Sequence, residues 1–339
     1  MRFSTSAFAP ACTSPNHCEA DPLRLYPDAS GGEAAVTRYR VFPGMELDYR
    51  DVHARACREL RDGSGERLEI HHCLEGRVEY RQNGRYFYLS PGDLAVARTS
   101  SLPPDSRFPT GHYHGITVTI DPAAAPECLS CILSDVEVRP ATLMEKLCPG
   151  RTVFTARSSR RVKHVFSELY AVPEDIRKGY LKVKLLELLL FLSTLSPEDG
   201  QTPHGCTAAQ VSLAEQVKAR LLAEPDRTLT LKSLSQQFNV SEAQIKSSFT
   251  GVYGMSPASY ARSQRMHGAA ALLRETDRTV LDIACQFGYD NASKFARAFR
   301  DVIGVSPREY RAGAEYDSCA PQLGEKPVSL SDADVERRI

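Results

Sequence analysis

Residues 280–299 read VLDIACQFGYDNASKFARAF. The stretch predicts a short apolar helix, a tight turn at Gly288 and a second helix. Phe295 and Phe299 are four positions apart in that second helix, so they share one buried face. Gly288 suits the left-handed end of the first helix. Two short helices joined in this way are typical of a helix-turn-helix unit.

A similar stretch occurs earlier, where residues 231–249 read LKSLSQQFNVSEAQIKSSF. Here Ile245 and Phe249 take the places of the two buried phenylalanines. Residues that can cap the second helix follow each turn: Ser241 in the first unit, and Asp290 or Asn291 in the second. An ordinary helical bundle also has short turns, but a repeat with matching offsets favours two helix-turn-helix units.

The second helix of such a unit places its outward face in the DNA major groove. The outward positions are polar or small, as contact with base edges requires: Ala243, Gln244, Lys246 and Ser247 in the first unit, and Ser293, Lys294, Arg297 and Arg300 in the second. Arg297 can pair with guanine, whereas Lys246 and Arg300 are expected at phosphates. Residues 211–312 hold 14 basic and 10 acidic residues, an excess of about four positive charges that suits DNA.

The whole chain has 339 residues and no net charge, so overall charge favours no partner. Its length allows two domains plus tails. The apolar run 185–192 is interrupted by Glu187 and cannot span a membrane, and the first residues lack the apolar core of a signal peptide. A cytoplasmic protein is expected.

Upstream of the helical repeat the pattern is β-like. Asn83–Gly84 is a strong hairpin signal, and residues 90–93 form a second turn between apolar and aromatic runs. Many short strands separated by turns favour a small barrel or sandwich. The expected organisation is a mobile arm (1–35), a β effector domain (36–157), a helical connector or dimerisation segment (158–206), a DNA-binding domain (207–312) and a flexible tail (313–339).

The connector contains a leucine-rich helix over residues 180–195. Its leucines recur at helical spacing: Leu181, Leu185, Leu188, Leu189 and Leu192. Such a face must be buried, either against the protein's own β domain or across a homodimer interface, and the sequence leaves both open.

Ten cysteines are scattered along the chain without a regular framework, so free thiols are the expectation. Cys128 and Cys131 form one CxxC, with Cys148 further on, but no second pair stands at metal-ligand spacing.

The C-terminal hundred residues resemble the DNA-binding domain of AraC-type regulators. The markers are GMSPASY from Gly254, DIACQFGY from Asp282, and GVSPREYR from Gly304. The resemblance implies two helix-turn-helix units joined by a rigid helix, about residues 256–274, which meet successive major grooves. One departure is Ser247, where the family often carries an arginine.

The N-terminal part more loosely resembles cupin-like sensory domains. Three stretches carry this resemblance: LEGRVEY from Leu74, the Asn83–Gly84 turn and SPGDL from Ser90. The predicted fold class is therefore α+β and multidomain: a cupin-like β-barrel, a helical connector and an all-α double helix-turn-helix domain. Candidate effector-binding residues are His71, His72, Tyr86, Tyr88, His112, Tyr113 and His114. Adjacent residues of a strand point to opposite faces, so one of His71 and His72 can face the lumen.

Two alternatives to an effector pocket remain open: a three-histidine metal site, and a filled barrel that serves dimerisation. No acidic ligand is clearly placed, so no metal site and no cofactor are assigned.

The predicted function is a DNA-binding transcription regulator controlled by a small molecule. Its expected partners are double-stranded DNA, a second copy of the chain and RNA polymerase. No interaction with a membrane is expected. A DNA-repair alkyltransferase would need an activated cysteine, but Cys73 lies on a strand beside a histidine that faces away, and Cys285 is expected to be buried in a helix. No catalytic residue is assigned. A constitutive, ligand-free DNA-binding protein is the other alternative.

Overall fold

The computed structural model describes residues 20–24, 26–27, 31–58, 65–126, 138–150, 153–157, 159–200, 205–223 and 229–313. The described chain forms two compact units, one ending at Arg265 and the other beginning at Met266. The predicted tail, apart from Gly313, and the CxxC of Cys128 and Cys131 lie outside the described residues.

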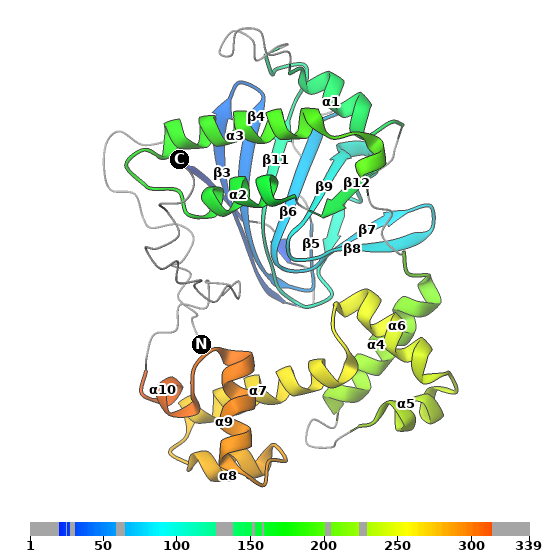
Figure 1. The fold of residues 1–339 in the computed structure, drawn as a ribbon, viewed down its shortest axis with the longest axis vertical. Helices are drawn as coiled ribbons and strands as arrows, with labels where there is room; N and C mark the ends of the chain where they lie inside the picture. The colour runs from blue at the N-terminus through cyan, green and yellow to red at the C-terminus, as the bar shows by residue number, and fades with distance from the viewer. Residues whose placement is uncertain are drawn as a thin grey trace, which may run out of the picture. The chain divides into compact units, whose positions relative to one another are not determined.

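The first unit begins with an antiparallel β-sheet domain (Figure 1). Its large sheet has seven strands in the order β1 (Ala20–Arg24), β3 (Gly32–Phe42), β4 (Met45–Ala54), β11 (Tyr113–Ile120), β6 (Leu68–Gly76), β9 (Asp93–Arg98) and β12 (Phe154–Arg157). A three-stranded sheet has the order β10 (Asp105–Arg107), β5 (Ala56–Arg58), β2 (Tyr26–Pro27). The hairpin of β7 (Val78–Gln82) and β8 (Arg85–Leu89) completes the domain.

The predicted turns are confirmed. Asn83 and Gly84 both have positive φ, 51° and 72°, and join β7 to β8. Gly92, at φ 81°, lies in the turn before β9, where the Ser90 amide donates to the Asp93 carboxylate. Part of the segment that was expected to be a mobile arm (1–35) is strand, because β1 pairs with β3 along its whole length. The pairing joins residues 11 to 19 positions apart, from Arg24 with Ala35 to Ala20 with Tyr39, and no period within the segment signals it.

Three helices cover one face of the large sheet: α1 (Pro140–Leu147), α2 (Arg160–Tyr170) and α3 (Arg177–Thr194) (Figure 1). Alternate residues of each strand point toward these helices, as Met45 and Leu47 do in β4, and the residues between them point to the opposite face. The opposite face forms a second core with Phe108, Leu89 and Val78.

The leucine-rich face of α3 packs within this domain. Its five leucines are all buried in the core between α2, α3 and the sheet: Leu181, Leu185, Leu188, Leu189 and Leu192. Of the two alternatives that the sequence left open, the structure shows packing against the protein's own β domain, so these leucines are not available for a subunit interface. No helix among the described residues is both long and apolar enough to span a bilayer.

The remaining chain is helical except for short turns. The first unit ends with α4 (Ala208–Ala223), α5 (Leu231–Phe238), α6 (Glu242–Tyr253) and the start of α7 (Pro257–Glu275). The second unit contains the end of α7, then α8 (Val280–Gln286), α9 (Ala292–Ile303) and α10 (Pro307–Arg311). Each set of helices has its own apolar core, one around Phe249 and the other around Phe299.

Candidate nucleic-acid interface and effector pocket

The first helix-turn-helix unit consists of α5 and α6. Asn239 ends α5 in the left-handed conformation, at φ 52°. A short polar side chain tolerates this conformation better than most, which explains why a turn without glycine works here. Ser241 then caps α6, and its Oγ accepts a hydrogen bond from the Gln244 amide at 3.2 Å. The predicted cap is confirmed.

The second unit consists of α8 and α9. Gly288 has φ 80° between them, as the sequence predicted. Asn291 is the cap: its Oδ1 accepts hydrogen bonds from the amides of Ser293, at 2.7 Å, and Lys294, at 3.2 Å. Asp290, the alternative, lies instead 3.9 Å from the Lys294 ammonium.

Both units end with the same motif. A left-handed glycine stops each second helix, Gly254 at φ 76° and Gly304 at φ 91°. The serine two residues later starts the next helix: Ser256 Oγ accepts from the Ser259 amide, and Ser306 forms a capping box with Glu309.

An aromatic contact holds each motif against its recognition helix. The Tyr260 ring meets Phe249 edge-on at 5.5 Å, and the Tyr310 ring meets Phe299 edge-on at 5.6 Å. The phenylalanine precedes the tyrosine by eleven residues in both units. The two units are therefore repeats in their packing as well as in sequence.

The outward faces of α6 and α9 hold the predicted DNA-binding residues. All eight are exposed: Ala243, Gln244, Lys246, Ser247, Ser293, Lys294, Arg297 and Arg300. The opposite faces bury Ile245 and Phe249 in α6, and Phe295 and Phe299 in α9. The helices differ in charge. The charges of Glu242 and Lys246 cancel, so α6 has no net charge. Helix α9 has three basic residues and one acidic residue, Asp301, and therefore a net charge of +2.

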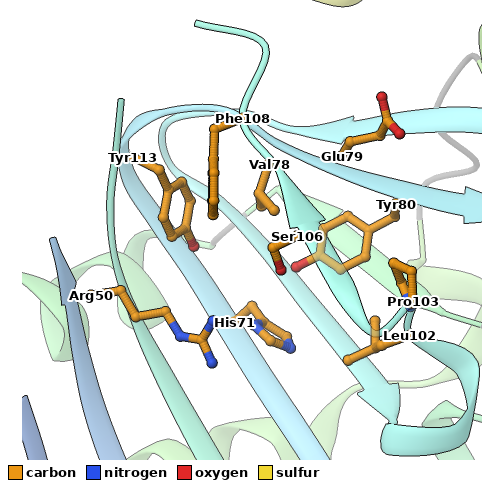
Figure 2. Close-up of a pocket in the computed structure, with 10 residues that line it drawn as sticks. All are labelled: Arg50, His71, Val78, Glu79, Tyr80, Leu102, Pro103, Ser106, Phe108 and Tyr113. Carbon is orange, nitrogen blue, oxygen red and sulfur yellow. The ribbon is translucent and has the colours of Figure 1, made fainter. Parts of the chain in front are cut away.

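The sheet domain contains a pocket on the face opposite the helices (Figure 2). It is lined by Arg50, His71, Val78, Glu79, Tyr80, Leu102, Pro103, Ser106, Phe108 and Tyr113. Figure 2 shows Arg50, His71 and Tyr113 pointing into a common space, while the Glu79 carboxylate turns away from it. Glu79 instead accepts a hydrogen bond from the Tyr88 hydroxyl at 3.2 Å.

Buried contacts position the pocket side chains. The His71 ring lies between Thr117 Oγ1, 3.1 Å from Nδ1, and Glu69 Oε2, 3.0 Å from Nε2. The Tyr113 ring packs on Phe108 with centroids 5.2 Å apart. Burial raises the pKa of Tyr113 well above its usual value, so its hydroxyl is a neutral donor and acceptor at physiological pH.

Of the seven predicted effector residues, His71 and Tyr113 line this pocket. His72 points to the helical face, where its ring stacks on Phe166 at 4.0 Å and its Nδ1 lies 3.1 Å from the Tyr170 hydroxyl. Burial, with a smaller effect of Lys163, lowers its pKa to about 4 and keeps the ring neutral. The prediction that only one of the two histidines faces inward is confirmed.

The other four candidates lie elsewhere. Tyr86 and Tyr88 of β8 pack with the core of the first helix-turn-helix unit. His112 and His114 have ring centroids 6.5 Å apart, and the ring of His114 lies beside Asp51. Sequence reasoning missed most of the pocket lining, including Arg50 and Phe108. No signal in the sequence pointed to Arg50, because the same strand also carries Glu46, Asp48, Asp51 and His53.

The cysteines show no activated thiol among the described residues. Cys73 is buried, and burial raises its pKa, which disfavours the thiolate. Cys285 is exposed, so the expectation that it is buried was wrong. It lies on the outer side of α8, whose buried residues are its neighbours Ile283 and Ala284.

Comparison with known proteins decides the family. A helix-turn-helix domain family matches residues 234–313. An uncharacterized HTH-type transcriptional regulator of Escherichia coli K12, YdiP, is 35% identical over 275 residues, which cover 77% of this chain and 88% of the relative. The chain belongs to the AraC family of helix-turn-helix transcriptional regulators.

Two further proteins are similar to this chain. The arabinose operon regulatory protein of Escherichia coli K12 is 24% identical over 275 residues, covering 76% of this chain and 83% of the relative. The crystal structure of a probable AraC family regulator from Rhodopseudomonas palustris is 30% identical, with a TM-score of 0.28, and covers 30% of this chain and 95% of that one. As a member of the AraC family, the protein is a DNA-binding transcription regulator and not an enzyme.

Proposed function

We propose that this AraC-family protein regulates transcription in response to a small molecule that binds in the pocket of a cupin-like N-terminal domain. The observation that supports it best is the pocket itself, which is walled by Arg50, Tyr80, Phe108 and Tyr113. In this proposal residues 36–157 form the effector domain, 158–206 connect it, and 207–312 bind DNA.

The lining indicates the chemistry of the effector. Arg50 supplies fixed positive charge and several N–H donors, which suit a carboxylate or another anionic group. Tyr80, Phe108 and Tyr113 supply aromatic surface for a compact, flat or apolar body. We therefore expect a small anion with an apolar portion.

Strand β7 connects this pocket to the first helix-turn-helix unit. Val78, Glu79 and Tyr80 line the pocket, and the residue before them, Arg77, donates from Nη1 to the Thr250 carbonyl oxygen in α6 at 3.3 Å. An effector that shifts β7 would change this contact with a recognition helix. Coupling between two sites is typically worth about 1–3 kcal/mol.

On the DNA side, α6 and α9 enter successive major grooves. The proposed contacts are Ala243, Gln244, Lys246 and Ser247 from α6, and Ser293, Lys294, Arg297 and Arg300 from α9. Arg297 is the principal base contact, because arginine pairs bidentately with guanine while Ser247 cannot form that pair.

A second copy of the chain is the proposed protein partner, with RNA polymerase a further one. The buried leucines of α3 cannot form the dimer contact, but Ile176 and Val183, with 52% and 61% of their surface exposed, offer apolar area at its N-terminal end. The double variant Ile176→Lys/Val183→Lys should sediment as a monomer. A wild-type protein that is already monomeric at high concentration would contradict the dimer.

The effector proposal is tested on the full chain with operator DNA obtained by binding-site selection. Small organic anions are screened for a change in operator affinity, and Arg50→Gln should abolish the response while leaving ligand-free affinity unchanged. Arg40→Gln, at an exposed position of the same domain, is the matched control. A response that survives Arg50→Gln would place the effector elsewhere, and a regulator that ignores every candidate anion would favour constitutive binding.

A further inference from the structure

Two histidines and an aspartate lie together on the helical face of the large sheet. Asp51 and His53 are two residues apart in β4, so their side chains point to the same face. His114 of β11 is the direct cross-strand partner of Asp51. These three side chains converge because of the pairing of β4 with β11, which joins segments more than sixty residues apart.

The ligating atoms are spaced as they would be around one ion. Asp51 Oδ1 lies 3.0 Å from His53 Nε2 and 3.2 Å from His114 Nδ1, and the three ligand atoms all lie within 4.8 Å of one another. Metal–nitrogen and metal–oxygen bonds of about 2.1 Å, at angles between 90° and 109°, place neighbouring ligand atoms roughly 3.0–3.4 Å apart. The two Asp51–histidine distances fall in this range, and the ligand atoms of the two histidines lie within 4.8 Å of each other.

The cluster is open on one side and surrounded by negative charge. The His53 side chain is 57% exposed, whereas that of His114 is 10% exposed. Two further carboxylates flank it through strand pairing: Glu33 is the partner of His53 across β3 and β4, and Glu75 is the partner of His114 across β6 and β11. An ion entering past His53 would be attracted by these charges and would keep coordination positions for water.

We propose that Asp51, His53 and His114 form a binding site for a divalent transition-metal ion of the zinc type. Imidazole nitrogen with one carboxylate is a donor set that suits Zn²⁺, Co²⁺ and Ni²⁺, and it is less suited to Mg²⁺ or Ca²⁺, which prefer oxygen ligands. The acidic ligand that sequence reasoning could not place is Asp51. This set also differs from a three-histidine site, because His71 points to the pocket on the other face.

The position of the site ties it to the effector pocket. Arg50 and Tyr113, which line the pocket, immediately precede Asp51 and His114 in the chain and point to the opposite face of the same strands. A bound ion would cross-link β4 to β11 directly behind this wall. This consequence depends on the proposed effector function, but metal binding itself does not.

Cobalt is the probe, because its visible absorption reports the ligand set. The full-length protein, reduced and freed of metal, is titrated with Co²⁺, and Zn²⁺ affinity is measured by calorimetry. We expect one ion per chain with visible d–d bands and no thiolate charge-transfer band. His53→Ala, at an exposed position, and the near-isosteric Asp51→Asn should each weaken binding by at least about tenfold.

His164→Ala is the matched control, since His164 is an exposed histidine of α2 in the same domain, and it should bind as the wild type does. Circular dichroism confirms that every variant is folded. Three results would overturn the proposal: no binding of Co²⁺ or Zn²⁺ at millimolar concentration, binding with thiolate absorption, or unchanged affinity in both His53→Ala and Asp51→Asn. Loss of binding in His112→Ala alone would also overturn it, because it would place the ion in a different histidine set.

Discussion

The two helix-turn-helix units share a packing plan and differ in their turns and charges. Each buries a phenylalanine of its recognition helix against a tyrosine eleven residues later, Phe249 with Tyr260 and Phe299 with Tyr310. In the first helix-turn-helix unit, the turn is made at Asn239 and the recognition helix has no net charge. In the second helix-turn-helix unit, the turn is made at Gly288 and the recognition helix has a net charge of +2.

This difference separates the parts of the unit that hold it together from the parts that contact a ligand. The aromatic pair, the glycine stop and the serine caps recur because both units must solve the same packing problem. The outward positions do not recur because nothing in the fold constrains them. We infer that the second helix-turn-helix unit contributes more to sequence discrimination, and the first contributes more to positioning, with a contact to the β-sheet domain through Arg77.

The largest expected effect tests the shared packing. Phe299→Ala and Phe249→Ala should each lower the free energy of unfolding of their own unit by about 3–5 kcal/mol, because each leaves a cavity in a closed aromatic core. Denaturant titration followed by circular dichroism measures the loss. Leu281→Ala, at a position with 51% of its surface exposed, is the control and should change stability by less than about 0.5 kcal/mol. A loss of less than about 1 kcal/mol in the free energy of unfolding of either variant would show that the two aromatic cores do not stabilise their units equally.

The next effect tests the division of specificity. Arg297→Ala should relax the selected sequence at one or two base pairs, with a loss of about 1–3 kcal/mol in discrimination, because a bidentate guanine contact is removed. Ser247→Ala, at the matching position of α6, should change it less. Binding-site selection on both variants is the measurement. A broader motif from Ser247→Ala than from Arg297→Ala would reverse the assignment.

A third comparison concerns the turns. Gly288→Ala should cost about 1–2 kcal/mol of stability, since an L-residue is disfavoured at φ 80° although its Cβ would meet no atom within 4 Å. Asn239→Gly should cost less than this, because glycine adopts the left-handed conformation freely. Thermal unfolding compares the pair, with Gly179→Ala on an open helical site as the control that should be neutral or stabilising. Equal losses of stability in Gly288→Ala and Asn239→Gly would show that the residue types at the two turns do not differ in their effect on stability.

The smallest effect concerns phosphate contacts. Lys246→Ala and Arg300→Ala should each make the salt dependence of DNA affinity shallower, by about 0.9 in the slope of log K against log salt, without changing the selected motif. Titrations at several salt concentrations measure the slope. Lys178→Ala, an exposed lysine of α3, should leave it unchanged. A changed motif with either variant would indicate base contact instead.

Much of this molecule was determined by short-range sequence alone. The spacing of Phe295 and Phe299, the glycine at position 288 and the cap at Ser241 predicted the helix-turn-helix units, because helical periodicity and turn chemistry act over a few residues. The eight outward positions followed from the same period, and all are exposed. Alternation along β6 likewise predicted that His71 and His72 face apart.

The tertiary structure alone decided which distant residues meet. The leucine face of α3 was certain to be buried, but only the fold decided that it packs against its own sheet. Arg50 reaches the pocket, and Asp51 reaches His114, through the pairing of β4 with β11. Strand register between segments far apart in the chain is set by the packing of the whole sheet, and no local period in the sequence records it.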